Sequence, residues 1–258
     1  GADPIGTVTL NSDRTGHDFI GRARGTPHMN VIEMPVAVRS APRLTTDDVA
    51  ALDARFAGTD PHDVVAWAVE RFGRRLSLTA SFADTLLIDI ATRVDPDIEV
   101  VFIDTGFHFP ETLATVRLAM ARYSLNLTVL RPTPTAADRW AHDVDTCCGS
   151  RKVAPLERHL VAHADAWMSG IRRDDSAHRS ATPVVDLDLR GLVKINPLAA
   201  WEPERLERYV LEHDVLVNPL VFQGYPSIGC WPCTEPAARD DSRSGRWRGS
   251  AKTECGIH

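Results

Sequence analysis

The stretch LSLTASFADTLLIDIATRVDPDIEVVFID, residues 76–104, carries the pattern that decides the fold. Its first five residues have the composition of a short strand, and apolar residues at helical spacing follow over 86–91. The stretch closes on IEVVFID (98–104), a continuous apolar run that is typical of a strand covered on both faces. A strand, a helix and a buried strand in this order predict right-handed crossovers in a parallel sheet.

The same alternation continues on both sides of this stretch. Helical signals begin near Thr45, and Asp60 as a cap with Pro61 in the first turn predicts a helix that ends at Gly73. Downstream, the pattern predicts two helices, over 110–123 and 203–213, and two strands, over 127–130 and 166–169. The predicted fold class is therefore α/β, with a mostly parallel sheet and helices on both faces. Ligands bind beyond the carboxyl ends of such strands, which points to the loops 79–85, 104–112 and 169–173.

The chain divides into three regions by composition. Residues 1–42 are rich in Gly, Pro, Arg and Asp and are expected to form a mobile N-terminal arm. Residues 43–235 are expected to form a single α/β domain. A Pro/Gly-rich tail begins after the predicted helix 203–213. Its last part, 236–258, is expected to be a flexible segment that carries Cys255.

Composition excludes several classes of protein. The 258 residues are 43% hydrophobic and 25% charged, which excludes a mainly disordered chain, a collagen-like repeat and a coiled-coil rod. No stretch approaches the roughly 18 consecutive apolar residues of a membrane span. A formal net charge of −6 gives no global basic field, so no nucleic-acid partner is expected.

The use of cysteine indicates the compartment. Five cysteines, clustered in the second half of the chain, do not resemble the even, spread framework of a secreted protein. No signal-peptide pattern is evident at the N-terminus. We therefore expect a reducing, cytoplasmic compartment, in which clustered cysteines more often bind metal or react than crosslink.

Four of the cysteines form two pairs. Cys147 and Cys148 are adjacent, and Cys230 and Cys233 form a CxxC motif. Four thiolates suit zinc or an iron–sulfur cluster. Neighbouring residues on a helix project about 100° apart, so converging the adjacent sulfurs on one small ion strains the backbone. The pattern favours a cluster, with zinc and a structural or disulfide role left as alternatives.

Two further residues are candidates for catalysis. Lys152 follows the first pair in CCGSRK, where its charge can reach both the thiolates and an anionic ligand; a solvated surface lysine is the alternative. Cys255 has no partner cysteine, and nearby cations such as His258 favour its thiolate. A thiol on a flexible segment can meet a buried substrate and then a protein reductant, although an incidental exposed cysteine is the alternative.

Arginine pairs supply candidate anion ligands. Arg172 with Arg173, and Arg243 with Arg246, can form planar bidentate contacts to sulfate or phosphate oxygens. Trp247 can stack on a base or cover the site. Ordinary surface charge is the alternative for each pair.

The turn after the first strand is a candidate nucleotide loop. Ser81 and Asp84 lie where a helix N-terminus can cradle an anion or nucleotide. No glycine occurs between Gly73 and Gly106, so the match to a Gly-rich phosphate loop is poor. The stretch 104–112 is a stronger indication of the edge of a site.

Together these motifs resemble the assimilatory sulfonucleotide reductases, specifically the iron–sulfur adenosine 5′-phosphosulfate (APS) reductases of bacteria and plants. The resemblance covers roughly residues 60–258. It rests on seven blocks in order: DTGFHFPET (104–112), CCGSRKVAPL (147–156), SGIRR (169–173), VKINPLAAW (193–201), GYPSIGCWPC (224–233), RSGRW (243–247) and ECGIH (254–258).

The resemblance implies a fold, a cofactor and a mechanism. The fold is of the adenine nucleotide alpha hydrolase (PP-loop) type, and a 4Fe-4S cluster is bound by the four paired cysteines. Cys255 attacks the sulfur of APS, AMP leaves, and thioredoxin releases sulfite from the resulting S-sulfocysteine. The implied anion ligands are Lys152, Arg172 or Arg173, Arg243 and Arg246, and the implied nucleotide contacts are Asp84 and Ser81. The resemblance also implies a catalytic role for His258, which assists the same anion or the Cys255 thiolate. The loop TASFADT is shorter or altered against the family's usual Ser-Phe-rich, acid-containing version, and it also lacks the Gly-rich core of ATP pyrophosphatases.

Three rival functions stay open at this point. A reductase for the 3′-phosphorylated substrate, PAPS, is the nearest, but the resemblance implies APS because most PAPS reductases lack the four cysteines. An ATP-dependent adenylating or tRNA-thiolating enzyme needs an intact pyrophosphate loop. A non-enzymatic iron–sulfur redox sensor would explain the four paired cysteines but would leave Cys255 and the arginine pairs without a role. The expected partners are thus APS, AMP and thioredoxin, with no nucleic acid and no membrane, and a homo-oligomer is expected.

Overall fold

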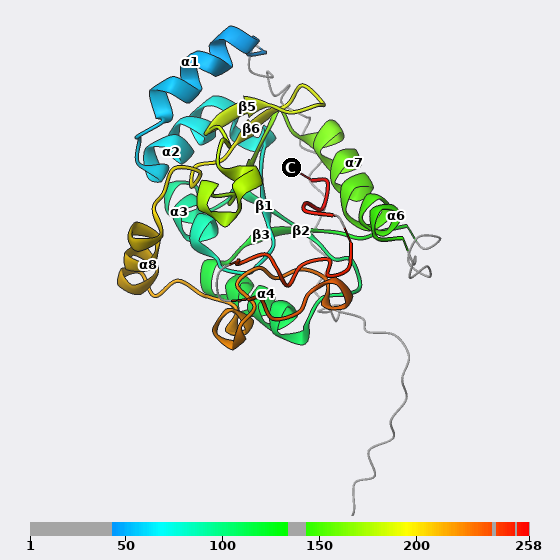
Figure 1. Cartoon of the computed structure of the whole chain (residues 1–258). Coiled ribbons are helices and arrows are strands. Elements are labelled where there is room, and N and C mark those ends of the chain that lie inside the picture. Colours follow the sequence, from blue (N-terminus) through cyan, green and yellow to red (C-terminus); the bar gives the residue numbers. More distant parts are fainter. Residues whose placement is uncertain (1–42, 134–142, 239–240, 251, 258) are drawn as a thin grey trace, which may run out of the picture. The chain divides into compact units, whose positions relative to one another are not determined.

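One six-stranded sheet forms the centre of the fold. The computed structural model describes residues 43–133, 143–238, 241–250 and 252–257, so the predicted N-terminal arm lies outside the described residues (Figure 1). The strands are β1 (Leu76–Ala80), β2 (Glu99–Ile103), β3 (Asn126–Leu130), β4 (Ala166–Ser169), β5 (Val185–Leu187) and β6 (Val193–Ile195). They lie in the order β3-β2-β1-β4-β6-β5, and only β5 runs antiparallel to its neighbour.

Helices cover both faces of this sheet. They are α1 (Thr46–Phe56), α2 (Pro61–Phe72), α3 (Leu86–Val94), α4 (Pro110–Tyr123), α6 (Val144–Cys148), α7 (Ala154–His163) and α8 (Pro203–Glu212). Figure 1 shows α1, α2 and α3 on one side of the sheet and α6 and α7 on the other. A π-helical segment, Gly149–Val153, joins α6 to α7.

Alternation along the strands supplies both layers of the core. On β2, Val100 and Phe102 point into the larger cluster with α2, α3 and α4, whereas Val101 points into a smaller cluster with Trp167 and with Leu156 of α7. Because successive strand residues face opposite sides, one continuous apolar run serves both layers. This is the arrangement that the run 98–104 predicts.

Most of the sequence predictions for local structure are confirmed. The helix Pro110–Tyr123 and the strands Leu76–Ala80 and Ala166–Ser169 have the predicted bounds. Asp60 caps α2 by accepting a hydrogen bond from the His62 backbone N–H. The predictions did not include β5 and β6, which have three residues each and are too short for a periodic signal.

The order of strands places a ligand site. The chain leaves β1 towards β2 and β3 on one side, and β4 lies on the other side of β1. Crossovers that diverge in this way open a crevice beyond the carboxyl ends of the strands, the usual binding position in open α/β sheets.

The C-terminal part of the chain folds over this crevice. After α8, the residues that the structure describes contain little regular structure beyond the 3₁₀ turns η5 (Pro219–Gln223) and η6 (Trp231–Cys233). Isolated bridges join Asp84 to Val217 and Thr234 to Arg246. The last described residues run between the sheet and α7, where Ile257 packs against the smaller core cluster (Figure 1). The predicted flexibility of 236–258 stays a prediction.

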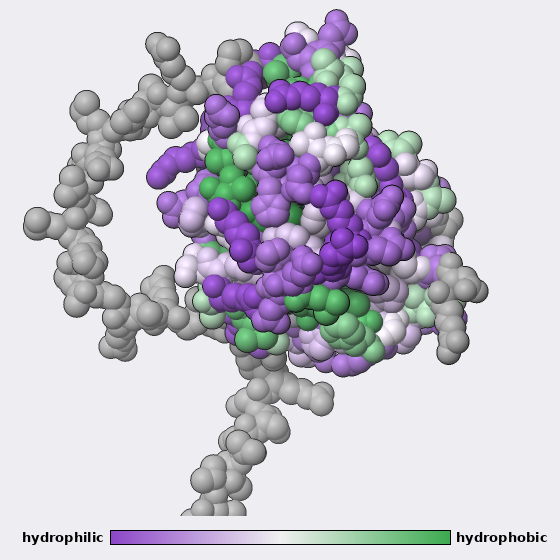
Figure 2. Space-filling model, turned by 90° about the vertical axis from the view of Figure 1, so that its left-hand side faces the viewer, coloured by the Kyte–Doolittle hydropathy of each residue, from purple (hydrophilic) through white to green (hydrophobic). Residues whose placement is uncertain are grey.

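The surface seen from the side of α1 and α8 is mostly hydrophilic, with smaller hydrophobic patches (Figure 2). Among the described residues, no helix is long and apolar enough to cross a membrane.

Candidate active site

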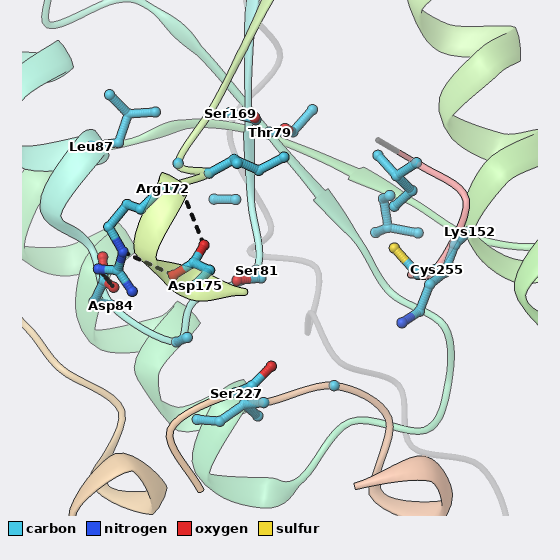
Figure 3. A pocket seen from close by; sticks show the side chains of 18 of the residues that line it. Thr79, Ser81, Asp84, Leu87, Lys152, Ser169, Arg172, Asp175, Ser227 and Cys255 are labelled. Atoms are coloured by element: carbon cyan, nitrogen blue, oxygen red, sulfur yellow. Dashed lines mark hydrogen bonds and ion pairs between the residues drawn. The ribbon is translucent and has the colours of Figure 1, made fainter. Parts of the chain in front are cut away.

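A cavity of about 250 Å³ lies at the carboxyl ends of β1, β2 and β4. Residues from all three predicted loops line it, together with Lys152 of the π-helical segment and residues of the C-terminal part of the chain. Figure 3 shows Asp84, Arg172 and Asp175 on one side of this cavity, Lys152 and Cys255 on the other, and Ser81 between them. The fold therefore brings together candidates that lie far apart in the sequence.

The loop after β1 is held in place by a buried amide. Phe82 is fully buried with a left-handed backbone, φ 57°. The Asn218 backbone N–H donates to the Ala83 carbonyl (3.0 Å), and its side-chain amide donates to the Phe82 carbonyl (3.2 Å). These bonds fix the loop and leave Ser81 and Asp84 lining the cavity.

Asp84 links this loop to the loop after β4. One carboxylate oxygen accepts from the Leu86 backbone N–H at the start of α3 (3.0 Å). The other lies 3.8 Å from Arg172 Nη1. Arg172 Nε donates to Asp175 (3.0 Å), so a short acidic and basic network forms this wall of the cavity.

Only one arginine of the first predicted pair lines the cavity. Arg173 is not among the lining residues, and its Nε donates to the Thr182 backbone carbonyl (2.9 Å). The choice between Arg172 and Arg173, which the sequence left open, therefore favours Arg172 as the ligand-facing residue.

The second arginine pair lies together at the cavity. Arg246 Nη1 and Arg243 Nη1 both donate to Ser227 Oγ, at 3.1 and 3.4 Å. The guanidinium of Arg246 lies over the Trp247 ring at 4.3 Å and that of Arg243 at 5.6 Å. Trp247 thus provides a buried platform for the two cations.

A glycine makes room for Arg246. A Cβ at Gly229 would lie 2.6 Å from Arg246 Cζ, closer than real side chains approach. Arg246 Nε is buried and has no hydrogen-bond partner among the described residues. The Arg246 guanidinium therefore has little room to move, and its Nε–H lacks a hydrogen-bond acceptor among the described residues.

The crowding of cations favours an anionic ligand. Burial and the neighbouring charge of Arg243 lower the pKa of Arg246, and burial and the charge of Arg179 lower the pKa of Arg243. The lowered pKa values mean that the charged forms of both arginines are less favourable here than in water. An anion bound between these residues would relieve that cost.

The two predicted catalytic residues lie on the far side of the cavity from Asp84. Lys152 comes from the π-helical segment, and Cys255 from the last described residues (Figure 3). π-Helical turns occur frequently at functional sites. His258, the third predicted catalytic residue, lies outside the described residues.

His108 is a packed side chain at the cavity, held by a hydrogen bond and a ring contact. Its Nε2 lies 2.9 Å from the Ile103 carbonyl oxygen, and its ring packs against Phe102 at 4.8 Å. Burial and the charge of Lys152 lower its pKa, so the ring is neutral near pH 7. It lines the cavity as a packed, uncharged group.

The four paired cysteines come from two elements beside the cavity. Cys147 and Cys148 end α6, whereas Cys230 precedes the turn η6 and Cys233 ends it. All five cysteines of the chain are free, so a disulfide role is not observed. Thr105 Oγ1 lies 3.3 Å from Cys230 Sγ.

The thiols of the two cysteine pairs are close enough to influence one another. Among the described residues, no three His, Cys, Asp or Glu side chains are placed to hold one metal ion. Burial and the negative charge of Cys230 nevertheless raise the pKa of Cys147 and of Cys233, so the thiols of the two pairs are electrostatic neighbours. A cubane binds each thiolate at a different iron and so accepts wider spacing than a tetrahedral ion.

Sequence reasoning missed several residues that shape the site. Asp175 and Arg179 line the cavity from a segment without a recognised motif, and Asn218 supports the Ser81 loop from far along the chain. Ser227, which bridges the two arginines, lies within the block GYPSIGCWPC but had no assigned role.

Comparison with known proteins identifies the family. The family profile of the phosphoadenosine phosphosulfate reductase domain matches residues 76–236. The chain belongs to the phosphoadenosine phosphosulfate reductase family. The match spans β1 to η6 and so includes both cysteine pairs and most of the cavity.

Similar members of this family carry a more specific name. The chain is 44% identical over 229 residues to the adenosine 5′-phosphosulfate reductase of Streptomyces coelicolor, covering 83% of this chain and 96% of the relative. It is 40% identical over 247 residues to the protein of the same name from Mycobacterium tuberculosis, covering 84% of this chain and 97% of the relative.

Solved structures support the same fold. The phosphoadenylyl-sulfate reductase of Candida auris, solved as a phosphate complex, aligns with a TM-score of 0.67 and 28% identity over 76% of this chain and all of that chain. The FMN adenylyltransferase of Candida glabrata aligns with a TM-score of 0.53 at 16% identity, over 75% of this chain and 68% of that chain, a likeness of fold alone. Both support the predicted adenine nucleotide alpha hydrolase type of fold.

Proposed function

We propose that this member of the family is an APS reductase, which reduces APS to sulfite and AMP with thioredoxin as the electron donor. One observation carries the proposal: Cys255 and Lys152 line the same cavity as the Arg243, Arg246 pair. A thiol nucleophile and its anion ligands are thereby collected at one site. The relatives named as APS reductases align over most of the chain and support the same assignment.

The cavity suggests how the substrate lies. Asp84 and Ser81 are the proposed contacts of the nucleoside, at the end where a βα loop commonly holds a nucleotide. Arg243 and Arg246, with Lys152, are the proposed ligands of the phosphosulfate. This orientation directs the sulfur of APS towards Cys255.

The first step transfers a sulfonate group. The Cys255 thiolate forms a bond to the sulfur of APS, and the bond from that sulfur to the bridging phosphate oxygen breaks. AMP leaves with the electron pair of the broken bond, and Cys255 becomes an S-sulfocysteine. Cations beside the sulfonate reduce its repulsion of the thiolate and stabilise the phosphate that leaves.

The second step requires a reductant with two thiols. One thioredoxin thiolate attacks Cys255 Sγ, and sulfite leaves with the electron pair of the S–S bond. The second thioredoxin thiol then resolves the mixed disulfide, which restores the Cys255 thiol and leaves thioredoxin oxidised. Each turnover thus consumes one dithiol and yields one sulfite.

The two cysteine pairs are the proposed ligands of a 4Fe-4S cluster, Cys147 and Cys148 from α6 with Cys230 and Cys233 from η6. The bound cluster would supply a fixed charge beside the cavity without exchanging electrons with the substrate. Lys152 follows the first cysteine pair by one helical turn. Cluster binding by Cys147 and Cys148 would therefore fix the backbone that carries Lys152, whose ammonium group is a proposed anion ligand.

The choice of substrate is tested by comparing two nucleotides. Sulfite release is measured from APS and from PAPS, with thioredoxin and its reducing system present. We expect APS to be used far better than PAPS. Equal or better use of PAPS would overturn the assignment in favour of a PAPS reductase.

A further inference from the structure

The residue before the proposed nucleophile is held by two arginines. Arg179 makes a bidentate pair with Glu254: Nε donates to one carboxylate oxygen (2.7 Å) and Nη2 to the other (2.8 Å). Arg243 Nη2 donates to Glu254 as well (3.2 Å) and to the Thr253 backbone carbonyl (3.0 Å). Both carboxylate oxygens of Glu254 are therefore occupied by fixed donors.

Arg179 is anchored to the α/β domain rather than to the tail. It ends the turn η4 (Ala177–Arg179), and its Nη1 donates to Asp175 (2.9 Å). The side chains of Arg179 and Glu254 are 13% and 23% exposed, so water screens their attraction only in part. The pair joins positions that lie 75 residues apart in the sequence.

Cys255 has a second anchored neighbour on its other side. Ile257 packs against the cluster that contains Leu156 and Trp167, and Gly256 allows the turn between them with φ 84°. The backbone of Cys255 is thus fixed from Glu254 on one side and from Ile257 on the other. Lys252 also pairs with Asp145, but this contact lies at the surface.

We infer that Arg179 is a positioning residue, whose ion pair with Glu254 holds Cys255 in the cavity. Arg179 then acts on the reaction through Glu254 and not as a ligand of the substrate. This inference rests on the proposed role of Cys255. When the pair is broken, the segment 252–257 leaves the cavity more often and exposes the thiol to solvent and to a protein reductant.

Alkylation of Cys255 tests the inference on the intact, cluster-loaded protein. Iodoacetamide is added without any sulfonucleotide, and the modified fraction of the tryptic peptide that follows Lys252 is measured over time by mass spectrometry. We expect Glu254→Gln to accelerate alkylation by about 10- to 100-fold, the range that charge-assisted hydrogen bonds correspond to. Arg179→Lys keeps the charge but loses the bidentate geometry, and an intermediate rate is expected.

Two comparisons separate direct coupling from general loosening of the fold. Arg248→Gln removes an exposed ion pair with Glu235 in the same C-terminal region, and it is expected to leave the alkylation rate unchanged. The double variant Arg179→Gln, Glu254→Gln is expected to react as fast as Glu254→Gln alone, because Glu254→Gln already removes the ion pair with Arg179. Unchanged rates in Glu254→Gln, or effects of the two substitutions that multiply, would overturn the inference.

This readout is independent of the proposed chemistry, because alkylation requires no sulfur donor. If Cys255 never accepts a sulfonate but its protection still depends on Arg179, the proposed function fails and the ion pair keeps its role. If Cys255 accepts a sulfonate but neither substitution changes its alkylation rate, only the inference about Arg179 fails.

Discussion

At the scale of single residues, Arg246 is the clearest candidate for an anion ligand in the cavity. Its guanidinium lies over the Trp247 ring and donates to Ser227, and its buried Nε has no partner among the described residues. A guanidinium is costly to bury unless an opposite charge compensates it. Its position is therefore better explained by a ligand than by stability.

Replacing Arg246 should weaken catalysis much more than folding. We expect Arg246→Gln to lower kcat/KM for sulfite release from APS by about 10²- to 10³-fold, as loss of a preorganised donor to a developing charge does. Arg246→Lys should recover only part of this loss, because an ammonium cannot reproduce the planar fork. Steady-state assays at equal cluster content provide the measurement.

The matched control for Arg246 is Arg248, two residues further along. It is exposed and pairs with Glu235 at the surface. Because exposed pairs contribute little, Arg248→Gln should keep kcat/KM within about twofold of the unmodified protein. Similar losses in the Arg246 and Arg248 variants would contradict a specific role for Arg246.

At the scale of elements, a polar network ties three strands and a helix together at the edge opposite to the cavity. Glu99 of β2 accepts from Ser77 of β1 (2.6 Å) and Thr128 of β3 (2.7 Å), and it lies 3.1 Å from His159 of α7. Burial alone would raise the pKa of Glu99, but these hydrogen bonds outweigh it and lower the pKa.

The lowered pKa of Glu99 makes its contribution to stability dependent on pH. A carboxylate with a depressed pKa stabilises the fold fully above its unfolded pKa, near 4.5, and loses this contribution as the pH falls through the folded value. Glu99→Gln should therefore lower the free energy of unfolding by about 2 kcal/mol at pH 7. The gap from the unmodified protein should narrow below pH 4.5.

Urea denaturation at pH 7 and at pH 4 measures both values. Glu204→Gln, which changes a carboxylate in the first turn of α8, serves as the control for the loss of one negative charge. A gap that stays constant or widens on acidification would contradict the network as described.

The elements also show what sequence reasoning can and cannot supply. Buried runs and end signals predicted β1, β4 and α4 with their observed bounds, because burial and capping leave a local pattern. Arg179 left no such pattern, since its partner Glu254 becomes a neighbour only when the tail folds back onto the domain. The three-residue strands β5 and β6 were missed for lack of length.

At the scale of the whole molecule, the C-terminal part of the chain completes a site that the sheet begins. The carboxyl ends of β1, β2 and β4 provide the floor, and the segment that contains Ser227 and Arg246 provides the cationic wall. Neither part forms the cavity alone. One half of the proposed cluster site, Cys230 with Cys233, lies in this later segment, so cluster binding should couple the two parts.

Iron content tests whether Cys230 of the later segment is a ligand of the cluster. Cys230→Ser should lower iron from about four per chain to near zero and remove the visible absorption of the cluster. Cys255→Ser should keep the iron and lose sulfite release, since it is proposed to act on the substrate alone. Iron and absorption are measured on proteins prepared without oxygen. Stoichiometric zinc in the unmodified, active protein would contradict the cluster.

The most direct test of the central claim is the mass of the chain after it has reacted with APS in the absence of any reductant. A transferred sulfonate group should be found on the tryptic peptide that contains Cys255, with one AMP released for each modified chain. A sulfonate on another residue, or AMP released without any modified chain, would contradict the account.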